Sequence, residues 1–374
     1  METEKERLVI AMSGGVDSSV CASMMVQHGY DCVGMTMRLW KELPPETEVC
    51  STTTGDAAKS CCGAESVDDA RLVAESLGMP YYAVNMRQEF WEEVVQVFAK
   101  EYFAGRTPSP CILCNEKFKF HMLYRKAKEI GASKICTGHY ARIEFDKEAG
   151  RWNLLRAVDP KKDQSYFLFS MTQDQLANTL FPLGGYTKDQ IRQMAGAARL
   201  VTAKKPESMD ICFIPDGDYS KFIERNFPQH LPGKGIVKDE EGNILGSHEG
   251  IHTVTVGQRK GLGIAYRHPL YVKRIHAKRN EVIVGSREST FGSKFTISRV
   301  NWICKEPLPG DSYHLNIRIR SRGPESPGTV YPLPNGGACV VFDQPQHAIT
   351  PGQAAVFYDG ERVFGGGWID SWEE

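Results

Sequence analysis

The chain has 374 residues, of which 41% are hydrophobic and 24% charged, and its formal net charge is −1. This balance excludes a protein that covers nucleic acid through bulk positive charge, although it allows a local basic patch. A chain of this length exceeds one ordinary hydrophobic core, so we expect a soluble globular protein of two or three domains.

The beginning of the chain, METEKERLVI, places acidic residues ahead of a short apolar run. It lacks the basic and long apolar regions of a secretory signal, and no stretch of about 18 apolar residues follows. Eleven cysteines without such a signal favour a reducing compartment, where cysteines serve catalysis or metal binding. We therefore expect a cytoplasmic protein that does not use a membrane as its partner.

Apolar runs and segments of helical period alternate through the first half of the sequence. The predicted strands are 7–12, 31–40, 81–86 and 133–140, and the predicted helices are 18–29, 66–77, 88–105 and 115–130. Ser66 and Asp69 predict a capping box at the start of the second of these helices. Repeated strand–helix units predict an open α/β fold with a mostly parallel sheet, which binds ligands at the carboxyl ends of its strands.

The second half has a different pattern, with short alternating strands separated by turn signals. The pairs Arg279-Asn280 and Asp359-Gly360 predict the turns of two hairpins. This pattern predicts a small antiparallel β-barrel at the C-terminus. We therefore expect three domains: a catalytic domain over 1–213, a small central linking domain over 214–285 and a C-terminal β-barrel over 286–374.

The first predicted strand runs directly into SGGVDSS, residues 13–19. Glycines let backbone N–H groups approach an anion closely, and the helix that follows adds its N-terminal donors. Asp17 by itself would repel a phosphate, which indicates a Mg²⁺ ion between the two. These features predict a nucleotide phosphate loop. The sequence contains no G-x-x-x-x-G-K-[ST] string, so the loop is not of the type that serves γ-phosphoryl transfer.

SGGVDSS is similar to the PP-loop of N-type ATP pyrophosphatases, a superfamily that cleaves ATP between its α and β phosphates. Other stretches resemble the tRNA-specific 2-thiouridylase family (MnmA type), in the family's order: PSPCILCNEKFKF, TGHYAR, KKDQSYFLF, ESMDICFI, VGQRKGLGI and TPGQAAVFY. The resemblance implies a Rossmann-like N-terminal domain of the adenine nucleotide alpha hydrolase type. It also implies ATP-dependent 2-thiolation of the wobble uridine of tRNA, with a separate protein that delivers the sulfur.

The chemistry of this reaction explains the need for ATP and for cysteines. A uracil C2 carbonyl is a poor electrophile, and adenylation of its oxygen makes AMP the leaving group. Thiolate sulfur is reactive near neutral pH, and a persulfide can transfer its terminal sulfur if a second cysteine then closes a disulfide. By the resemblance, Cys212 would carry the persulfide and Cys114 would be the partner in a transient Cys114–Cys212 disulfide.

Cys111 leaves a second source of sulfur open. In part of the family this position is an aspartate, whereas here Cys111 and Cys114 form C-x-x-C and Cys212 adds a third thiolate. Three cysteines can hold a [4Fe-4S] cluster whose open iron binds hydrosulfide. Both schemes need Cys114 and Cys212, so the sequence does not choose between them. The adjacent pair Cys61-Cys62 is not assigned to the site.

The resemblance also implies which residues bind ATP and RNA, with Asp17 serving catalysis beside the two cysteines. The residues expected around ATP are Ala11, Met12, Ser13, Gly14, Gly15, Val16, Asp17, Ser18, Met37 and Gly138. Those expected at the tRNA anticodon stem-loop and its flipped target base are Ser109, Pro110, Cys111, His139, Lys162, Asp163, Gln164, Arg320, Ser321 and Gln353. Flipping is expected because stacking otherwise shields C2.

With a net charge near zero, RNA affinity has to come from clustered basic side chains. Arg318, Arg320 and Arg322 are predicted to lie on one face of a barrel strand, which suits a platform for tRNA. Two alternatives remain open at this point. One is a PP-loop amide ligase that acts on a small metabolite, and the other is an iron–sulfur RNA-binding module whose ATP loop is regulatory.

Overall fold

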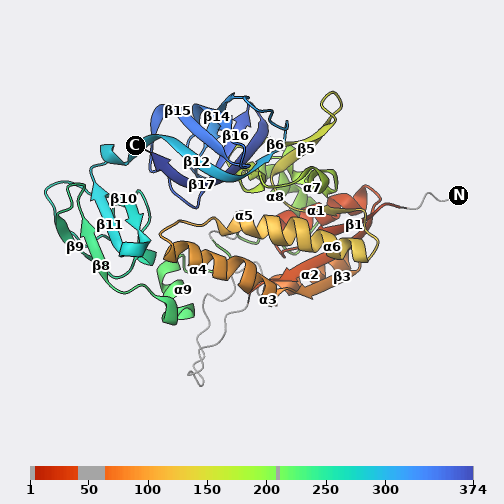
Figure 1. The fold of residues 1–374 in the computed structure, drawn as a ribbon. Helices are drawn as coiled ribbons and strands as arrows, with labels where there is room; N and C mark the ends of the chain where they lie inside the picture. The colour runs from red at the N-terminus through yellow and green to blue at the C-terminus, as the bar shows by residue number, and fades with distance from the viewer. Residues whose placement is uncertain (1–4, 41–63, 208–210, 374) are drawn as a thin grey trace, which may run out of the picture. The chain divides into compact units, whose positions relative to one another are not determined.

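The computed structural model describes residues 5–40, 64–207 and 211–373. The chain divides into two compact units, the first made of Met1–Val94 with Cys111–Gly217 and the second of Val95–Pro110 with Asp218–Glu374. Figure 1 shows the elements of each unit. Cys61 and Cys62 lie outside the described residues. Among the helices that the structure describes, none combines the length and the apolar character that crossing a membrane requires.

The first unit is built on a parallel sheet with the strand order β3-β2-β1-β4-β7. Its strands are β1 (Arg7–Ala11), β2 (Asp31–Arg38), β3 (Tyr81–Asn85), β4 (Lys134–Cys136) and β7 (Thr179–Leu180). In the central strand, Leu8 pairs with Cys32 of β2 and with Lys134 of β4. β1 is a continuous apolar run because both faces of a parallel sheet are covered. The predicted parallel α/β architecture is confirmed.

Helices cover this sheet and pack on each other, with α1 and α2 against β2, α6 against β4, and α8 against α1. The helical elements of this unit are α1 (Val16–Gln27), α2 (Ala64–Ser76), α3 (Arg87–Phe90), η2 (Trp91–Val95), α5 (Pro110–Cys114), η3 (Asn115–Met122), α6 (Leu123–Glu129), η4 (Ser165–Leu168), α7 (Gln173–Ala177), η5 (Pro182–Gly185) and α8 (Lys188–Ala197). Leu8, Ile10, Val20 and Leu183 lie in the core that joins sheet and helices.

Some local predictions in this unit are wrong. α2 begins at Ala64, so Ser66 lies inside the helix and does not cap it; it is buried, and its carbonyl faces Gly14. The helix predicted from residue 115 already begins at Pro110, because proline suits the first turn of a helix. Residues after 140, for which no element was predicted, form an antiparallel hairpin of β5 (Ala141–Asp146) and β6 (Arg151–Arg156).

The second unit contains a smaller sheet with the strand order β10-β11-β8-β9. Its strands are β8 (Gly235–Lys238), β9 (Ile244–His248), β10 (Tyr271–His276) and β11 (Glu281–Gly285), and its helical elements are α4 (Gln96–Phe103), α9 (Tyr219–Asn226), η6 (Pro228–His230), η7 (Ile251–Thr253), η8 (Ala277–Arg279) and η9 (Glu288–Thr290). The predicted turn between β10 and β11 is present, and Asn280 there takes a left-handed conformation with φ 52°. Val237, Val272 and Val282 form the core of this sheet.

The remaining strands of the second unit close into an antiparallel barrel, as the sequence predicted. They are β12 (Phe291–Trp302), β13 (Tyr313–Arg318), β14 (Ser326–Pro332), β15 (Ala338–His347), β16 (Ala354–Asp359) and β17 (Arg362–Glu373). The barrel closes because β12 pairs with both β15 and β17. Gly360, with φ +59°, makes the tight turn between β16 and β17. Phe295, Ile317 and Phe357 fill the interior.

Candidate active site

The predicted phosphate loop follows β1, at the carboxyl edge of the parallel sheet. Met12 continues the strand by donating its N–H to the Met35 carbonyl at 2.9 Å. Gly14 then takes φ +70°, and a Cβ added there would lie only 2.0 Å from the Ser66 carbonyl oxygen. Gly15 is the N-cap of α1 and has no side chain to cover the free N–H groups of the helix. The loop therefore presents bare backbone donors to an incoming anion.

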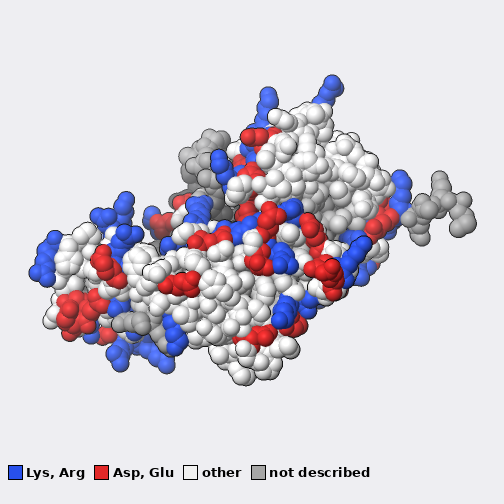
Figure 2. All heavy atoms as spheres, turned by 90° about the horizontal axis from the view of Figure 1, so that it is seen from above, with Lys and Arg blue, Asp and Glu red and all other residues white. Residues whose placement is uncertain are grey.

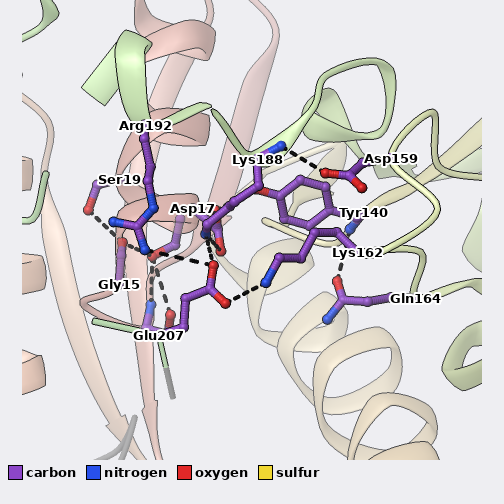
Figure 3. Close-up of polar contacts among 12 residues, drawn as sticks. Gly15, Asp17, Ser19, Tyr140, Asp159, Lys162, Gln164, Lys188, Arg192 and Glu207 are labelled. Atoms are coloured by element: carbon purple, nitrogen blue, oxygen red, sulfur yellow. Dashed lines mark hydrogen bonds and ion pairs between the residues drawn. The ribbon is translucent and has the colours of Figure 1, made fainter. Parts of the chain in front are cut away.

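Serine hydroxyls hold this loop in shape. The Ser18 hydroxyl donates to the Gly15 carbonyl at 3.1 Å and accepts the Ser13 N–H at 3.2 Å. The Ser19 hydroxyl also donates to the Gly15 carbonyl, at 2.9 Å (Figure 3). Because both serines bind within the loop, they fix its backbone before any ligand arrives.

Gly138, which follows β4, packs directly against the start of α1. A Cβ at this position would lie 3.1 Å from the Ser18 nitrogen and 3.2 Å from the Asp17 Cβ. Only a glycine lets this strand end come so close to the loop. The structure therefore brings Gly138 together with the phosphate loop. Met37 lies near the end of β2, the strand that pairs with β1 on its other side, and is partly exposed.

Asp17 is the centre of a charged network (Figure 3). Its two carboxylate oxygens lie 2.7 and 2.9 Å from the Lys188 ammonium nitrogen, and the Tyr140 hydroxyl donates to one of them at 2.7 Å. The Lys188 side chain is only 9% exposed. Burial, and then the charge of Asp17, raise the pKa of the Tyr140 hydroxyl, so it remains a donor.

Glu207 extends the network beyond Asp17. One of its oxygens lies 2.9 Å from the Lys188 ammonium, and the other accepts from Lys162 at 2.5 Å. Although partial burial opposes ionisation, the hydrogen bonds from Lys162 and Lys188 lower the pKa of the Glu207 carboxyl to about 2. Arg192 adds a third, more distant cation at 3.9 Å. Glu207 is therefore ionised at neutral pH and is the anion that these cations share.

The three cysteines predicted for sulfur chemistry are accessible, unlike those in the core. Cys111 is exposed, and Cys114 and Cys212 are partly exposed. By contrast, Cys32 is buried in the core, and burial raises the pKa of its thiol to about 11, so it is a poor nucleophile. Cys114 is the last residue of α5 and leads into the π-helical η3, a kind of turn that is frequent at functional sites.

The cysteines can also be tested as ligands of an iron–sulfur cluster. In residues 5–40, 64–207 and 211–373, no three His, Cys, Asp or Glu side chains stand together as they would around a metal ion, Cys111, Cys114 and Cys212 included. The geometry of the described residues therefore gives the cluster no support.

Comparisons with known proteins cover almost the whole chain. Residues 6–216 match the tRNA methyl transferase HUP domain, 220–286 the tRNA methyl transferase PRC-barrel domain and 292–369 the Aminomethyltransferase beta-barrel domain. The tRNA-specific 2-thiouridylase MnmA of Heliobacterium modesticaldum is 46% identical over 98% of this chain and 92% of that protein. The protein of the same name from Magnetococcus marinus is 47% identical over 98% of this chain and 99% of that protein.

The chain belongs to the tRNA-specific 2-thiouridylase MnmA family. This confirms the family and the enzyme class that the sequence motifs predicted. It also favours the tRNA sulfurtransferase over an amide ligase and over a non-enzymatic RNA-binding module.

Solved structures are similar to the chain at a much lower level. A 4-thiouridine synthetase–RNA complex with bound ATP is 16% identical, with a TM-score of 0.37, over 60% of this chain and 51% of that chain. The U34-tRNA thiolase NcsA from Methanococcus maripaludis with its [4Fe-4S] cluster is 19% identical, with a TM-score of 0.34, over 61% of this chain and 69% of that chain. At this level of similarity, these structures are not used to assign a fold or a function to the chain.

In this structure, several residues predicted to contact RNA lie close to the charged network. Lys162 reaches Glu207, and Gln164 accepts the Tyr140 N–H at 2.9 Å. Asp163 is instead held internally, where its carboxylate accepts the Ala157 N–H at 3.1 Å and the Ser165 hydroxyl at 2.9 Å.

His139 lies in the interior. One ring nitrogen lies 2.7 Å from the Thr137 hydroxyl and the other 3.3 Å from the Lys119 ammonium. Burial, and then the charge of Lys119, lower the pKa of its imidazole well below the usual value, so the ring is neutral.

The second unit holds most of the other predicted RNA residues, whereas Cys111 belongs to the first unit. Gln353 donates to the carbonyls of Thr107 at 3.0 Å and Pro108 at 3.2 Å, next to the buried Ser109 and Pro110. This fixes the segment that leads to the cysteine motif.

The predicted arginine face of the barrel is wrong, because β13 ends at Arg318 and the chain turns there. Arg318 pairs with Glu325 at 2.6 Å, whereas Arg320 is exposed. On the face shown in Figure 2, basic and acidic side chains are interspersed.

Sequence reasoning missed Lys188, Glu207 and Tyr140 as members of the site. Glu207 and Tyr140 lie in the motifs ESMDICFI and TGHYAR, so a signal for them was present. Lys188 lies in no such motif. It reaches Asp17 across a separation of 171 positions, which no local pattern reveals.

Proposed function

We propose that this protein catalyses the ATP-dependent 2-thiolation of the wobble uridine of tRNA, giving 2-thiouridine, AMP and pyrophosphate. The observation that carries the proposal is the 46% identity to a tRNA-specific 2-thiouridylase over 98% of the chain. The bare, preformed loop at the end of β1 supports the use of ATP, because it suits a chain of phosphates.

The nucleotide would bind at the carboxyl edge of the sheet. Residues 11–18 would surround the phosphates, with Gly138 beside them, and the backbone of Met37 would meet the adenine. Mg²⁺ fits the loop, because Asp17 offers a carboxylate among serine hydroxyls and Mg²⁺ is usually held by one or two carboxylates together with phosphates. When bound, the ion would neutralise negative charge on the departing pyrophosphate. Asp17 would hold it, and Tyr140 would orient Asp17.

The first step would activate the base. The C2 oxygen of the uridine attacks the α-phosphorus of ATP, the bond from this phosphorus to the bridging oxygen breaks, and pyrophosphate leaves. AMP is then attached to the C2 oxygen. The backbone N–H groups at the start of α1 would stabilise the phosphate charge in this step.

The second step would replace the oxygen by sulfur. The terminal sulfur of a Cys212 persulfide attacks C2 and AMP departs with the former uridine oxygen. The Cys114 thiolate then attacks the Cys212 sulfur. The bond between this sulfur and the sulfur now attached to C2 breaks, and 2-thiouridine is released. The product is a Cys114–Cys212 disulfide, which a thiol reductant returns to two thiols. A separate protein would load each new persulfide.

The tRNA would be bound through its anticodon stem-loop. Ser109, Pro110 and Cys111 would line the flipped base, and the remaining contacts are proposed for His139, Lys162, Asp163, Gln164, Arg320, Ser321 and Gln353. Because His139 and Asp163 are held by neighbouring groups in the structure, their contribution would be to shape the site rather than to bind phosphate.

The test is mass analysis of the nucleosides from tRNA incubated with the protein, ATP, Mg²⁺ and a sulfide source. We expect 2-thiouridine with the wild type and its loss with Cys114→Ala and with Cys212→Ala, whereas Cys339→Ala in the barrel strand β15 should retain it. Formation of 2-thiouridine with both Cys114 and Cys212 replaced would overturn the sulfur route. Iron that copurifies in proportion to activity, and is lost with Cys111→Ala, would favour the cluster-bound hydrosulfide instead.

A further inference from the structure

The Lys188 ammonium occupies the place where a cation would meet Asp17. It contacts both carboxylate oxygens of Asp17, at 2.7 and 2.9 Å, and one oxygen of Glu207 at 2.9 Å. We propose that Lys188 is a positioning residue that competes with the divalent cation for Asp17, and that Glu207 receives the lysine when the cation binds. This inference rests on the nucleotide site of the proposed function.

The competition follows from the geometry of the carboxylate. A hard cation such as Mg²⁺ binds a carboxylate oxygen at about 2.1 Å and carries two positive charges. Lys188 already covers both oxygens of Asp17, and Tyr140 donates to one of them. Two cations cannot share these oxygens at contact distance without strong repulsion in a partly buried site. The ion must therefore displace the ammonium from at least one oxygen.

The backbone of Lys188 is fixed, so the displacement has to be a movement of the side chain. Lys188 is the first residue of α8, whose N-cap Thr187 forms a capping box with Gln190. Its N–H also donates to Asp159 at 3.0 Å. The lysine ammonium is carried on a flexible four-carbon chain, so it can change partners without any change in the helix.

Glu207 lowers the free-energy cost of this change of partner. It is ionised at neutral pH, and it lies beside Lys188 and Lys162 at the same time. A buried ammonium that lost its only carboxylate would be strongly destabilised, whereas here a second carboxylate is already in contact. Glu207 also begins the motif that contains Cys212, so the same lysine touches the phosphate loop and the segment of the sulfur site.

The experiment measures Mn²⁺ binding to the nucleotide-free protein by electron paramagnetic resonance of the free ion. Removing a charge-assisted contact of this kind changes affinity by about tenfold. We therefore expect Lys188→Met to bind Mn²⁺ about tenfold more tightly than the wild type, and Asp17→Asn to lose the site. Arg192→Met is the matched control, because Arg192 approaches the same Glu207 at 3.9 Å but makes no contact with Asp17. Its affinity should stay near that of the wild type.

A second variant gives a change of the opposite sign and does not depend on the stability of Lys188→Met. In Glu207→Gln the lysine loses its alternative partner and stays on Asp17, so Mn²⁺ should bind several-fold more weakly, while the exposed Asp189→Asn on the same helix as Lys188 should have no effect.

Unchanged or weaker Mn²⁺ binding in a folded Lys188→Met, or equal changes in Arg192→Met, would overturn the competition. If Lys188→Met does not fold, binding by Glu207→Gln that equals the wild type would do so. Because the readout needs neither ATP nor tRNA, it is separate from the thiolation assay. If the wild-type protein forms no 2-thiouridine in that assay, the proposed function is rejected, whereas the competition between Lys188 and the cation is still tested by Mn²⁺ binding.

Discussion

In the first unit, charged side chains gather where the parallel strands end, whereas the barrel of the second unit keeps its interior apolar. Lys188 is only 9% exposed and touches two carboxylates at the carboxyl edge of the sheet. The barrel core holds Phe295, Ile317 and Phe357, and the Arg318–Glu325 pair lies at the end of β13.

The difference follows from how the two sheets are built. In a parallel sheet all strands end at the same edge, and the loops that follow them converge on one place. A closed antiparallel barrel has no such edge, because its strands alternate in direction and pair all the way round. The first architecture can therefore concentrate charge in one site, and the second provides a rigid surface.

Asp17→Asn removes the central charge of the first unit and has the largest expected effect. The release of pyrophosphate that depends on tRNA should fall by about 10²–10³-fold, because the carboxylate that would hold the cation is lost. A pyrophosphate assay measures this, with Asp189→Asn as the control for a carboxylate of the same unit that faces solvent. Wild-type release by a folded Asp17→Asn would contradict the assignment.

Phe357→Ala tests the apolar side of the comparison. This side chain is fully buried and packs against Trp302 with 5.9 Å between ring centroids. Its truncation should lower the free energy of unfolding by about 3–5 kcal/mol. Tyr331→Ala, at a position that is 44% exposed, should cost less than about 1 kcal/mol. Chemical denaturation compares the two, and equal losses would show that the barrel interior is not the source of its stability.

Gly14→Ala sharpens the comparison at the phosphate loop itself. The added Cβ would meet the Ser66 carbonyl at 2.0 Å in a residue with φ +70°. We expect a loss of about 3 kcal/mol in unfolding free energy, together with loss of nucleotide binding. Gly29→Ala is the matched control, because φ is +85° there and no atom lies within 4 Å of the new Cβ. It should cost only about 1 kcal/mol.

The charged network also predicts how stability depends on pH, which is the smallest effect. The pKa of Glu207 is about 2 in the folded protein against an ordinary value of 4.5. Because the folded pKa is the lower one, this carboxylate stabilises the fold fully above the ordinary value. The contribution is lost as the pH falls from there towards 2. Unfolding curves at several acidic pH values should therefore show a shallower decline for Glu207→Gln than for the wild type. Parallel curves would mean that the network does not stabilise the fold.

The sequence was sufficient for features that depend on neighbouring residues. The apolar run of β1 and the glycines that follow it predicted the strand and the loop, and the turns at Asn280 and Gly360 were predicted by their residue types. The family motifs predicted the enzyme class, which the relatives confirm. The domain boundaries, the cytoplasmic location and the roles of the individual site residues stay predictions.

What could not be predicted depends on contacts between distant residues. The sequence pattern around Lys188 indicates only a lysine in the first turn of a helix, and the fold brings it into contact with Asp17. Ser66 carries a good capping pattern, yet the helix extends past it. The arginines that follow β13 alternate like a strand, but the chain turns at Arg318. In each case the outcome was decided by tertiary structure and not by the neighbouring residues.

The helical run from Pro110 to Glu129 changes pitch in its middle, where η3 separates α5 from α6. A π-type turn contains an extra residue, so the stretch acts as a spacer that sets the angular phase of Cys114 relative to α6. Deleting one residue from η3 would restore an α-helical pitch and rotate the thiol by about 100° around the axis while the helix stayed continuous. The direction in which this sulfur points is thus encoded in the length of a segment that itself contains no cysteine.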